Sequence, residues 1–324
     1  MIDLHLHLDG AISLSSARQL AAISDVSIPA SDDDLLKLLR VSPNCRDLNE
    51  FLEKFAFPCS LLQTKESIKQ AVVNLLSELN EQSVIYAEIR FAPQKSTDKG
   101  LSMEDAVLAA ISGTENSPVK CNLILCCMRD SDNLDENLET VRLTHKYLGK
   151  GVCAADLAGA EALFPTSDFE EVFALARELN VPFTIHAGEA DGPQSIKCAI
   201  DMGASRIGHG LRAADDDSLI ELLASKHIPL EMCPTSNLNT CACDSYENYP
   251  LPAFLRAGIP VTINTDDPSI EGTTIKKEFR ALSEALGLNP DDILNLLFCA
   301  AKSSFASDDV KKELIQIISN YRTV

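Results

Sequence analysis

Histidine and acidic side chains stand at the ends of several short apolar runs that are spread over the whole sequence. They are His5, His7, Asp9, His186, Glu189, His209, Asp266 and Asp267. Imidazole nitrogens and carboxylate oxygens bind catalytic metal ions and transfer protons. Because such groups, displayed from the ends of separate strands, are typical of active sites on α/β scaffolds, the sequence predicts an enzyme.

The first candidate is a metal site. His5 and His7 are two residues apart, so on a strand they point to the same face. An HxH pair alone is weak evidence, but His186 and Asp266 follow other apolar runs and strengthen it. Three imidazoles and one carboxylate suit a single Zn²⁺ with one position open for water. Related binuclear barrel hydrolases need a bridging lysine at the fourth run, and 152–159 contains none, so we predict one metal ion per chain.

Three further residues are candidates for proton transfer. Glu189 lies three residues after His186, beside a metal ligand but too displaced to join it, which suits a general acid; a helix cap is the alternative. His209, between two glycines, could act as a base or electrostatic stabiliser, or could be a structural histidine. Asp267 is expected to bond the bound water or the substrate, because successive strand residues diverge and Asp266 takes the metal.

These residues need a scaffold, and eight β-like runs alternate with helical patterns to supply it. The runs are 2–7, 84–91, 121–127, 152–157, 181–186, 206–209, 228–232 and 260–264. The clearest helical patterns are 134–148, 169–180, 193–202, 216–226 and 250–257. Alternation implies parallel strands with right-handed crossovers, and eight strands close a barrel. We therefore predict an α/β fold, a (β/α)8 TIM-type barrel, as a single domain over 1–324.

The first crossover is much longer than the others. Residues 10–83 separate the first two strands and are patterned as helices near 13–22, 32–40, 47–62 and 65–80. An insertion after the C-terminal end of a barrel strand lies over the mouth of the barrel. We expect a helical lid that adds an apolar wall, with ordinary helix core as the alternative. The candidate wall residues are Phe51, Phe55, Phe57, Leu61 and Leu62.

Composition limits the partners. A net charge of -20 argues against a nucleic-acid partner and favours a neutral small molecule over an anionic one. The eleven cysteines form no disulfide or CxxC pattern, which suits buried thiols in a reducing cytoplasm. No apolar run approaches membrane-spanning length, and the first strand starts at residue 2, so we expect no membrane partner, no signal peptide and a cytoplasmic location. The sequence does not indicate an oligomeric state.

Six blocks of the sequence, taken in order, resemble the adenosine deaminase family within the metal-dependent amidohydrolase superfamily. They are His5–Ala11, Asp156–Gly159, His186–Ala190, Arg206–Gly210, Cys233–Asn237 and Asn264–Pro268. The resemblance covers essentially the whole chain. The unrelated cytidine and tRNA deaminase signature, H-x-E followed by P-C-x-x-C, is missing.

The resemblance implies a role for each site residue. Zinc would bind His5, His7, His186 and Asp266, and the substrate contacts would be His7, Asp9, Gly159 and Asp267. Asp9 would hold a ribose hydroxyl, and the backbone of Gly159 would bond the base. Glu189 would protonate ring N1, His209 would assist deprotonation of the zinc-bound water and stabilise charge, and Asp267 would orient the hydroxide towards C6.

The implied reaction is hydrolytic deamination of adenosine and 2′-deoxyadenosine to inosine and 2′-deoxyinosine with release of ammonia, in purine salvage. Alternative substrates are adenine, a 5′-modified adenosine or an N6-methylated nucleotide. Adenine deaminases of similar sequence generally carry Glu at the position of Asp9 and a serine-rich segment in place of 156–159, which favours the nucleoside. A nucleoside-binding pseudoenzyme is the non-enzyme alternative, but a binder has no need of both Glu189 and His209.

Overall fold

Eight parallel strands form the centre of the computed structural model, which describes residues 1–321. The strands are β1 (Ile2–His7), β2 (Tyr86–Phe91), β3 (Lys120–Arg129), β4 (Val152–Gly159), β5 (Thr184–Ala187), β6 (Arg206–His209), β7 (Leu230–Met232) and β8 (Val261–Ile263). They pair in two sets, β1-β2-β3-β4 and β5-β6-β7-β8. Bridges between Leu6 and Asp266 and between Ala155 and Phe183 join the sets. The predicted α/β barrel is confirmed; residues 322–324 of the predicted domain lie outside the described residues.

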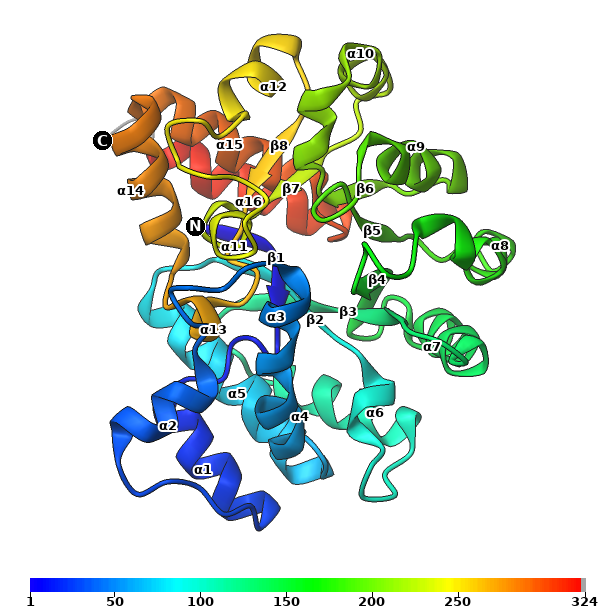
Figure 1. Ribbon diagram of the computed structural model, residues 1–324, viewed down its shortest axis with the longest axis vertical. Helices are drawn as coiled ribbons and strands as arrows, with labels where there is room; N and C mark the ends of the chain where they lie inside the picture. Colours follow the sequence, from blue (N-terminus) through cyan, green and yellow to red (C-terminus); the bar gives the residue numbers. More distant parts are fainter. Residues whose placement is uncertain (322–324) are drawn as a thin grey trace.

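Helices surround the strands (Figure 1). They are α1 (Leu14–Ser24), α2 (Asp32–Leu39), α3 (Leu48–Leu52), α4 (Ala56–Leu61), α5 (Lys65–Glu81), α6 (Met103–Thr114), α7 (Leu134–Tyr147), α8 (Glu170–Glu178), α9 (Pro193–Met202), α10 (Asp217–Lys226), α11 (Pro234–Asn239), α12 (Leu251–Ala257), α13 (Pro268–Glu271), α14 (Ile275–Leu286), α15 (Pro290–Ser303) and α16 (Asp308–Tyr321). Short 3-10 turns lie at Glu53–Phe55, Pro93–Ser96, Thr166–Phe169 and Leu211–Asp215. The sequence patterns predicted neither α6 nor the four helices that follow β8.

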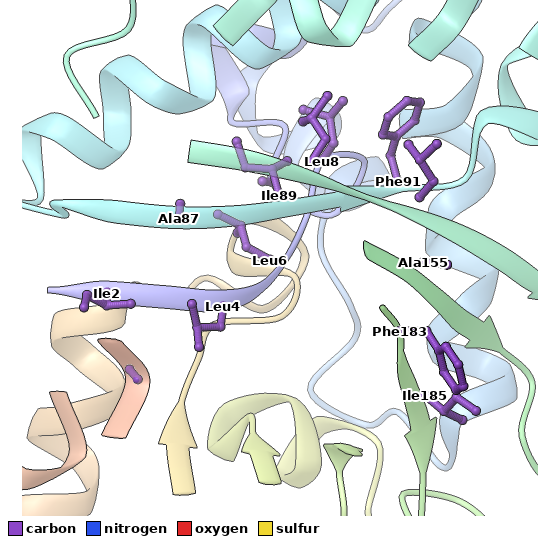
Figure 2. Packing of buried hydrophobic residues seen from close by; sticks show 14 of the residues in the cluster. Ile2, Leu4, Leu6, Leu8, Ala87, Ile89, Phe91, Ala155, Phe183 and Ile185 are labelled. Carbon is purple, nitrogen blue, oxygen red and sulfur yellow. The ribbon is translucent and has the colours of Figure 1, made fainter. Parts of the chain in front are cut away.

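The period of two along β1 separates its apolar from its polar side chains. Ile2, Leu4 and Leu6 belong to the main apolar core, which includes residues of the surrounding helices. Figure 2 shows Leu6 near Ile89 of β2, with Ile185 of β5 in a separate part of the same core. The alternate residues of β1 are polar and fully buried or nearly so. In β1, the apolar side chains therefore pack into the main core, and the polar side chains are left for the opposite face of the strand.

The insertion between β1 and β2 is helical, as expected, and contains α1 to α5. Figure 1 shows most of these helices grouped beside the barrel, with α3 nearer its centre. Ser13 and Thr64 cap α1 and α5 through their side-chain oxygens, which fixes where these helices begin. No helix among residues 1–321 is long and apolar enough to cross a bilayer.

Candidate active site

The four predicted metal ligands converge although they come from β1, from β5 and from the turn after β8. Nε2 of His186 lies 3.0 Å from Nε2 of His5 and 3.2 Å from Nε2 of His7. Oδ1 of Asp266 lies 3.2 Å from His5 Nε2 and 3.4 Å from His7 Nε2. Ligands about 2.0–2.1 Å from a tetrahedral zinc ion are separated by roughly 3.4 Å. The spacing therefore fits one small cation at the centre of this group.

The opposite ring nitrogens explain why a cation belongs there. Nδ1 of His5 lies 2.8 Å from Glu231 Oε2, and Nδ1 of His186 lies 3.0 Å from Asp156 Oδ2. A carboxylate accepts a hydrogen bond from each Nδ1–H, so the Nε2 lone pairs are left facing one another. Such lone pairs repel unless a positive ion lies between them. The donor set and its supporting carboxylates thus fit a metal ion.

A buried ion network lies behind the two histidines. Arg90 is fully buried and donates from Nη1 to Asp156 Oδ2 at 2.9 Å and from Nη2 to Glu231 Oε2 at 2.8 Å. Burial alone would raise the pKa of both carboxyls, but His186 and Arg90 outweigh it at Asp156, and Arg206 and Arg90 outweigh it at Glu231. The pKa of each is held below its usual range, so both remain acceptors.

Glu189 lies beside this group and is almost completely buried. Its Oε1 accepts a hydrogen bond from Thr240 Oγ1 at 3.1 Å. Burial, followed by the charges of Asp266 and Glu161, raises the pKa of Glu189 to about 8. A carboxyl group with this pKa keeps its proton at neutral pH and can donate it, which is what a general acid requires. The alternative helix-cap role is not seen, because Gly192 is the N-cap of α9.

His209 faces the same space from the end of β6. Its Nε2 lies 3.6 Å from both Glu189 Oε2 and Asp266 Oδ2. On the other side of the ring, Asn237 Nδ2 lies 3.0 Å from Nδ1. With the amide donating, Nδ1 accepts, and the proton of the neutral ring lies on Nε2, towards the site. Burial lowers the pKa of His209 well below its usual range, which keeps the ring neutral.

Asp267 diverges from Asp266 for a reason other than the one predicted. Both residues follow β8 instead of lying on it, and Asp266 has a positive φ of 62°. A turn, and not strand alternation, therefore separates the two side chains. Asp267 is buried, and its Oδ1 has no hydrogen-bond partner among the described residues. Burial, then the charges of Asp266 and Asp9, raises the pKa of Asp267 well above its usual range.

A cavity of about 430 Å³ opens from these groups, within the size range of small-molecule sites. His7, Asp9, Gly159, His186, Glu189, His209, Asp266 and Asp267 all line it. Gly159 has a φ of 110°, which favours glycine, and a Cβ there would lie 3.3 Å from the carbonyl oxygen of Arg129. Oδ1 of Asp9 is buried and lacks a partner among the described residues, so it is available to a ligand.

The apolar wall of the cavity comes mainly from the helical insertion, but only some of the predicted residues contribute to it. Phe51 and Phe55 line the cavity as expected, together with Leu48, Leu52, Ala56 and Cys59. The prediction was wrong for the remaining three residues, because Phe57, Leu61 and Leu62 pack into the main core instead. One face of α4 meets the barrel core, and the other faces the cavity. At the wall's edge, Lys95 and Asp130 also line the cavity, with Nζ 3.7 Å from Oδ2.

Several residues of the site escaped the sequence interpretation. Arg90, Glu231 and Asn237 were given no role, and Asp156 was noted only as part of a block. A signal for three of them is present: Arg90, Asp156 and Glu231 are charges inside otherwise apolar runs, and such charges are rarely buried unless they are paired. Asn237 carries no comparable signal, because its contact with His209 depends on the fold.

Known proteins resemble this chain over nearly its whole length. The family model described as adenosine deaminase matches residues 1–321. The adenosine deaminase of Haemophilus ducreyi is 46% identical, with 97% of this chain and 94% of that protein covered. The adenosine deaminase of Enterococcus faecalis is 40% identical, with 98% and 95% covered.

Solved structures are similar over the same length. An adenine deaminase from Arthrobacter aurescens has a TM-score of 0.90 at 28% identity, covering 100% of this chain and 99% of that one. An Arabidopsis N6-mAMP deaminase has a TM-score of 0.86 at 26% identity, covering 98% and 97%. Since the family model spans the described chain and the relatives are 40–46% identical at near-complete coverage, the protein belongs to the adenosine deaminase family.

Proposed function

We propose that this protein is a zinc-dependent hydrolase that converts adenosine and 2′-deoxyadenosine to inosine and 2′-deoxyinosine with release of ammonia. One observation carries the proposal: three imidazole nitrogens and a carboxylate converge at 3.0–3.4 Å beside a buried glutamate whose pKa is raised to about 8. A metal site next to a protonated carboxyl group suits attack by water on a ring carbon with simultaneous protonation of a ring nitrogen. The family's curated relatives, named adenosine deaminase, support the same reaction.

His5, His7, His186 and Asp266 would hold the zinc ion. The chemistry that zinc supplies when bound is activation of a water molecule for attack near neutral pH. Glu189 would donate its proton to ring N1, which makes C6 electrophilic. Of the two protons of the attacking water, one would restore the acid and the other would leave with the amino group as ammonia. The burial of Glu189 supports this role, since it keeps the carboxyl group protonated until the substrate arrives.

His209 and Asp267 would act on the attacking oxygen. Of the two roles implied for His209, the hydrogen bond from Asn237 supports stabilisation of developing negative charge, because it leaves the Nε2 proton directed into the site. Asp267 would accept a hydrogen bond from the attacking water and orient it towards C6. Its unpartnered Oδ1 supports that role.

The substrate would lie in the cavity with its base near the metal site. His7 would contact it, the backbone of Gly159 would bond the base, and Asp9 would accept a hydrogen bond from a ribose hydroxyl. A buried acceptor without a protein partner is costly unless a ligand satisfies it, which supports a nucleoside over free adenine. A nucleotide is disfavoured, because Lys95 at the cavity wall is already beside Asp130.

Three further assignments complete the proposal. The helical insertion of residues 10–83 would serve as the lid of a single barrel domain, supported by the cavity wall that α3 and α4 provide. The ligand would be a small molecule, with neither nucleic acid nor membrane as a partner, in keeping with a charge of -20. The proposed location is the cytoplasm, on the cysteine composition alone.

The test is an ultraviolet assay of the purified protein against adenosine, 2′-deoxyadenosine, adenine and 5′-methylthioadenosine, with metal analysis on the same sample. We expect about one zinc per chain and the highest kcat/KM with the first two substrates. Asp9→Ala should lower kcat/KM for adenosine by roughly 10–100-fold, the value of a hydrogen bond to a charged acceptor, and change it little for adenine. Higher kcat/KM with adenine than with either nucleoside, or equal losses in the variant, would contradict the nucleoside assignment.

A further inference from the structure

One buried carboxylate accepts hydrogen bonds from the backbone amides of the segment that contains Glu189. Glu161, two residues beyond β4, is 1% exposed. Its Oε1 accepts from the amide of Gly188 at 2.6 Å, and its Oε2 accepts from the amides of Glu189, Ala190 and Asp191 at 3.0, 2.8 and 3.0 Å. Four successive N–H groups therefore point at a single side chain. This arrangement fixes the backbone path of residues 188–191, because each bond constrains the peptide plane that donates it.

The same segment is held from its other side by a cation. Arg129 Nη2 donates to the carbonyl oxygen of His186 at 2.6 Å and to Thr166 Oγ1 at 2.9 Å. Thr166 Oγ1 lies 2.7 Å from Ser195 Oγ, which in turn donates to Glu161 Oε1 at 2.5 Å. Arg129, Thr166, Ser195 and Glu161 form a hydrogen-bonded chain, and the backbone from His186 to Gly188 closes it into a ring at the loop between β5 and α9. We name this ring the β5–α9 clamp.

The clamp does not serve as the cap of α9. That helix begins at Pro193 with Gly192 as its N-cap, and the four amides bound by Glu161 precede it. Only the hydroxyl of Ser195 belongs to the helix. What the clamp fixes is the turn itself, in which Gly188 has a φ of 71° and a Cβ at that residue would lie 2.4 Å from Ile196.

We propose that Glu161 is a positioning residue for Glu189, holding the loop so that the acid's carboxyl group meets the ring nitrogen of the substrate; this rests on the proposed function. The side chain of Glu189 has one hydrogen bond of its own, from Thr240, so its place depends on where its backbone lies. Glu161 holds that backbone directly, through the amide of Glu189 itself. A displacement of about 1 Å can cost a hundredfold in rate.

The variant Glu161→Gln tests the proposal while preserving size. The amide keeps one acceptor oxygen, but its NH₂ group faces N–H donors that it cannot satisfy. We expect faster hydrogen–deuterium exchange in a peptide covering 186–192, by at least roughly tenfold, because the amides lose their acceptor. We also expect a kcat for adenosine roughly 10–100-fold lower, a KM within about threefold of wild type and an unchanged metal content.

A double-mutant cycle separates positioning from general destabilisation. If Glu161 acts through Glu189, then Glu161→Gln should lower kcat little further in a Glu189→Gln background, since the acid is already absent. Independent losses that multiply would overturn the proposal. Glu170→Gln, an exposed carboxylate of α8 paired with Arg177, is the matched control and should leave exchange and kcat unchanged.

The exchange measurement does not depend on any substrate, so it separates the two hypotheses. Faster exchange in a protein whose wild type deaminates no purine would refute the proposed function and leave the clamp standing. Unchanged exchange, or faster exchange with wild-type kcat, would refute the positioning role of Glu161. If Glu161→Gln fails to fold, Ser195→Ala provides a second test, because it removes one of the five hydrogen-bond donors to Glu161. It should lower kcat by about two- to fivefold with the metal retained. Wild-type kcat in Ser195→Ala would count against the clamp.

Discussion

Gly10 offers the sharpest test of the proposed geometry, because its missing side chain leaves room for Asp267. A Cβ built on Gly10 would lie 1.7 Å from Oδ1, 2.5 Å from Cγ and 2.7 Å from Cβ of Asp267. The backbone of Gly10 lies outside the positive-φ region, so alanine is tolerated there conformationally. Gly10→Ala therefore perturbs the site through steric overlap and not through backbone strain.

The size of the effect follows from that overlap. To reach ordinary contact at 3.4 Å, Oδ1 of Asp267 must move by about 1.7 Å, and Asp267 is too buried to move freely. Since a shift of about 1 Å can cost a hundredfold, we expect kcat for adenosine to fall by roughly a hundredfold or more. Overpacking should also lower the free energy of unfolding by about 1–3 kcal/mol. An ultraviolet assay and urea denaturation measure the two effects.

The matched control is Gly192→Ala, at a glycine whose added Cβ meets nothing within 4 Å. It makes the same chemical change and should leave kcat within about twofold of wild type, at the small cost of losing a favourable N-cap. Metal analysis of both variants shows whether Asp266 still binds. If Gly10→Ala turns over adenosine at close to the wild-type rate with its metal in place, Asp267 has no positional role in the chemistry.

Two other expectations concern the acid and the buried network. Because Glu189 must carry a proton to act, and its pKa is about 8, kcat/KM should be level between about pH 7 and pH 8 and fall about tenfold per pH unit above pH 8. A profile level to pH 9.5 would remove Glu189 as the acid. Arg90→Met leaves Asp156 and Glu231 buried without their shared cation and should lower the free energy of unfolding of the metal-free protein by about 3–5 kcal/mol. Urea denaturation in the presence of a chelator measures it, and a loss under 1 kcal/mol would show that the network is not held by Arg90.

The convergence of the four proposed metal ligands was predictable, because the fold brings them together. Parallel strands of a barrel end at one rim, so histidines that terminate β1 and β5 must approach one another once eight strands are recognised. The strands themselves were readable from continuous apolar runs. By contrast, α6 was missed because it is apolar or small on most sides, with Ala106, Val107, Ala109 and Ala110 all buried, which hides the helical period.

The roles of the supporting residues were not predictable, because contacts across the barrel define them; a charge inside an apolar run marks Arg90 and Glu231 as paired but does not name their partners. Glu161 looks like any acidic residue after a strand, and only the fold reveals the amides that it accepts. Phe57 was misplaced among the cavity residues for a similar reason. Which face of a short helix meets the core depends on how the insertion packs against the barrel. An apolar residue in the sequence does not indicate which of the two faces it lies on.

The closure of the barrel also makes the affinity for the proposed metal ion depend on the association of the two halves of the chain. The amide of His7 donates a hydrogen bond to the carbonyl oxygen of Asp266, and the amide of Asp266 donates one to the carbonyl oxygen of His5. These bonds join β1 to the turn after β8. Each four-stranded half carries only two of the four proposed metal ligands. If the chain is cut between β4 and β5, each fragment alone should therefore bind the metal ion weakly. The affinity for the metal should return when the two fragments associate, so metal binding would measure their reassembly.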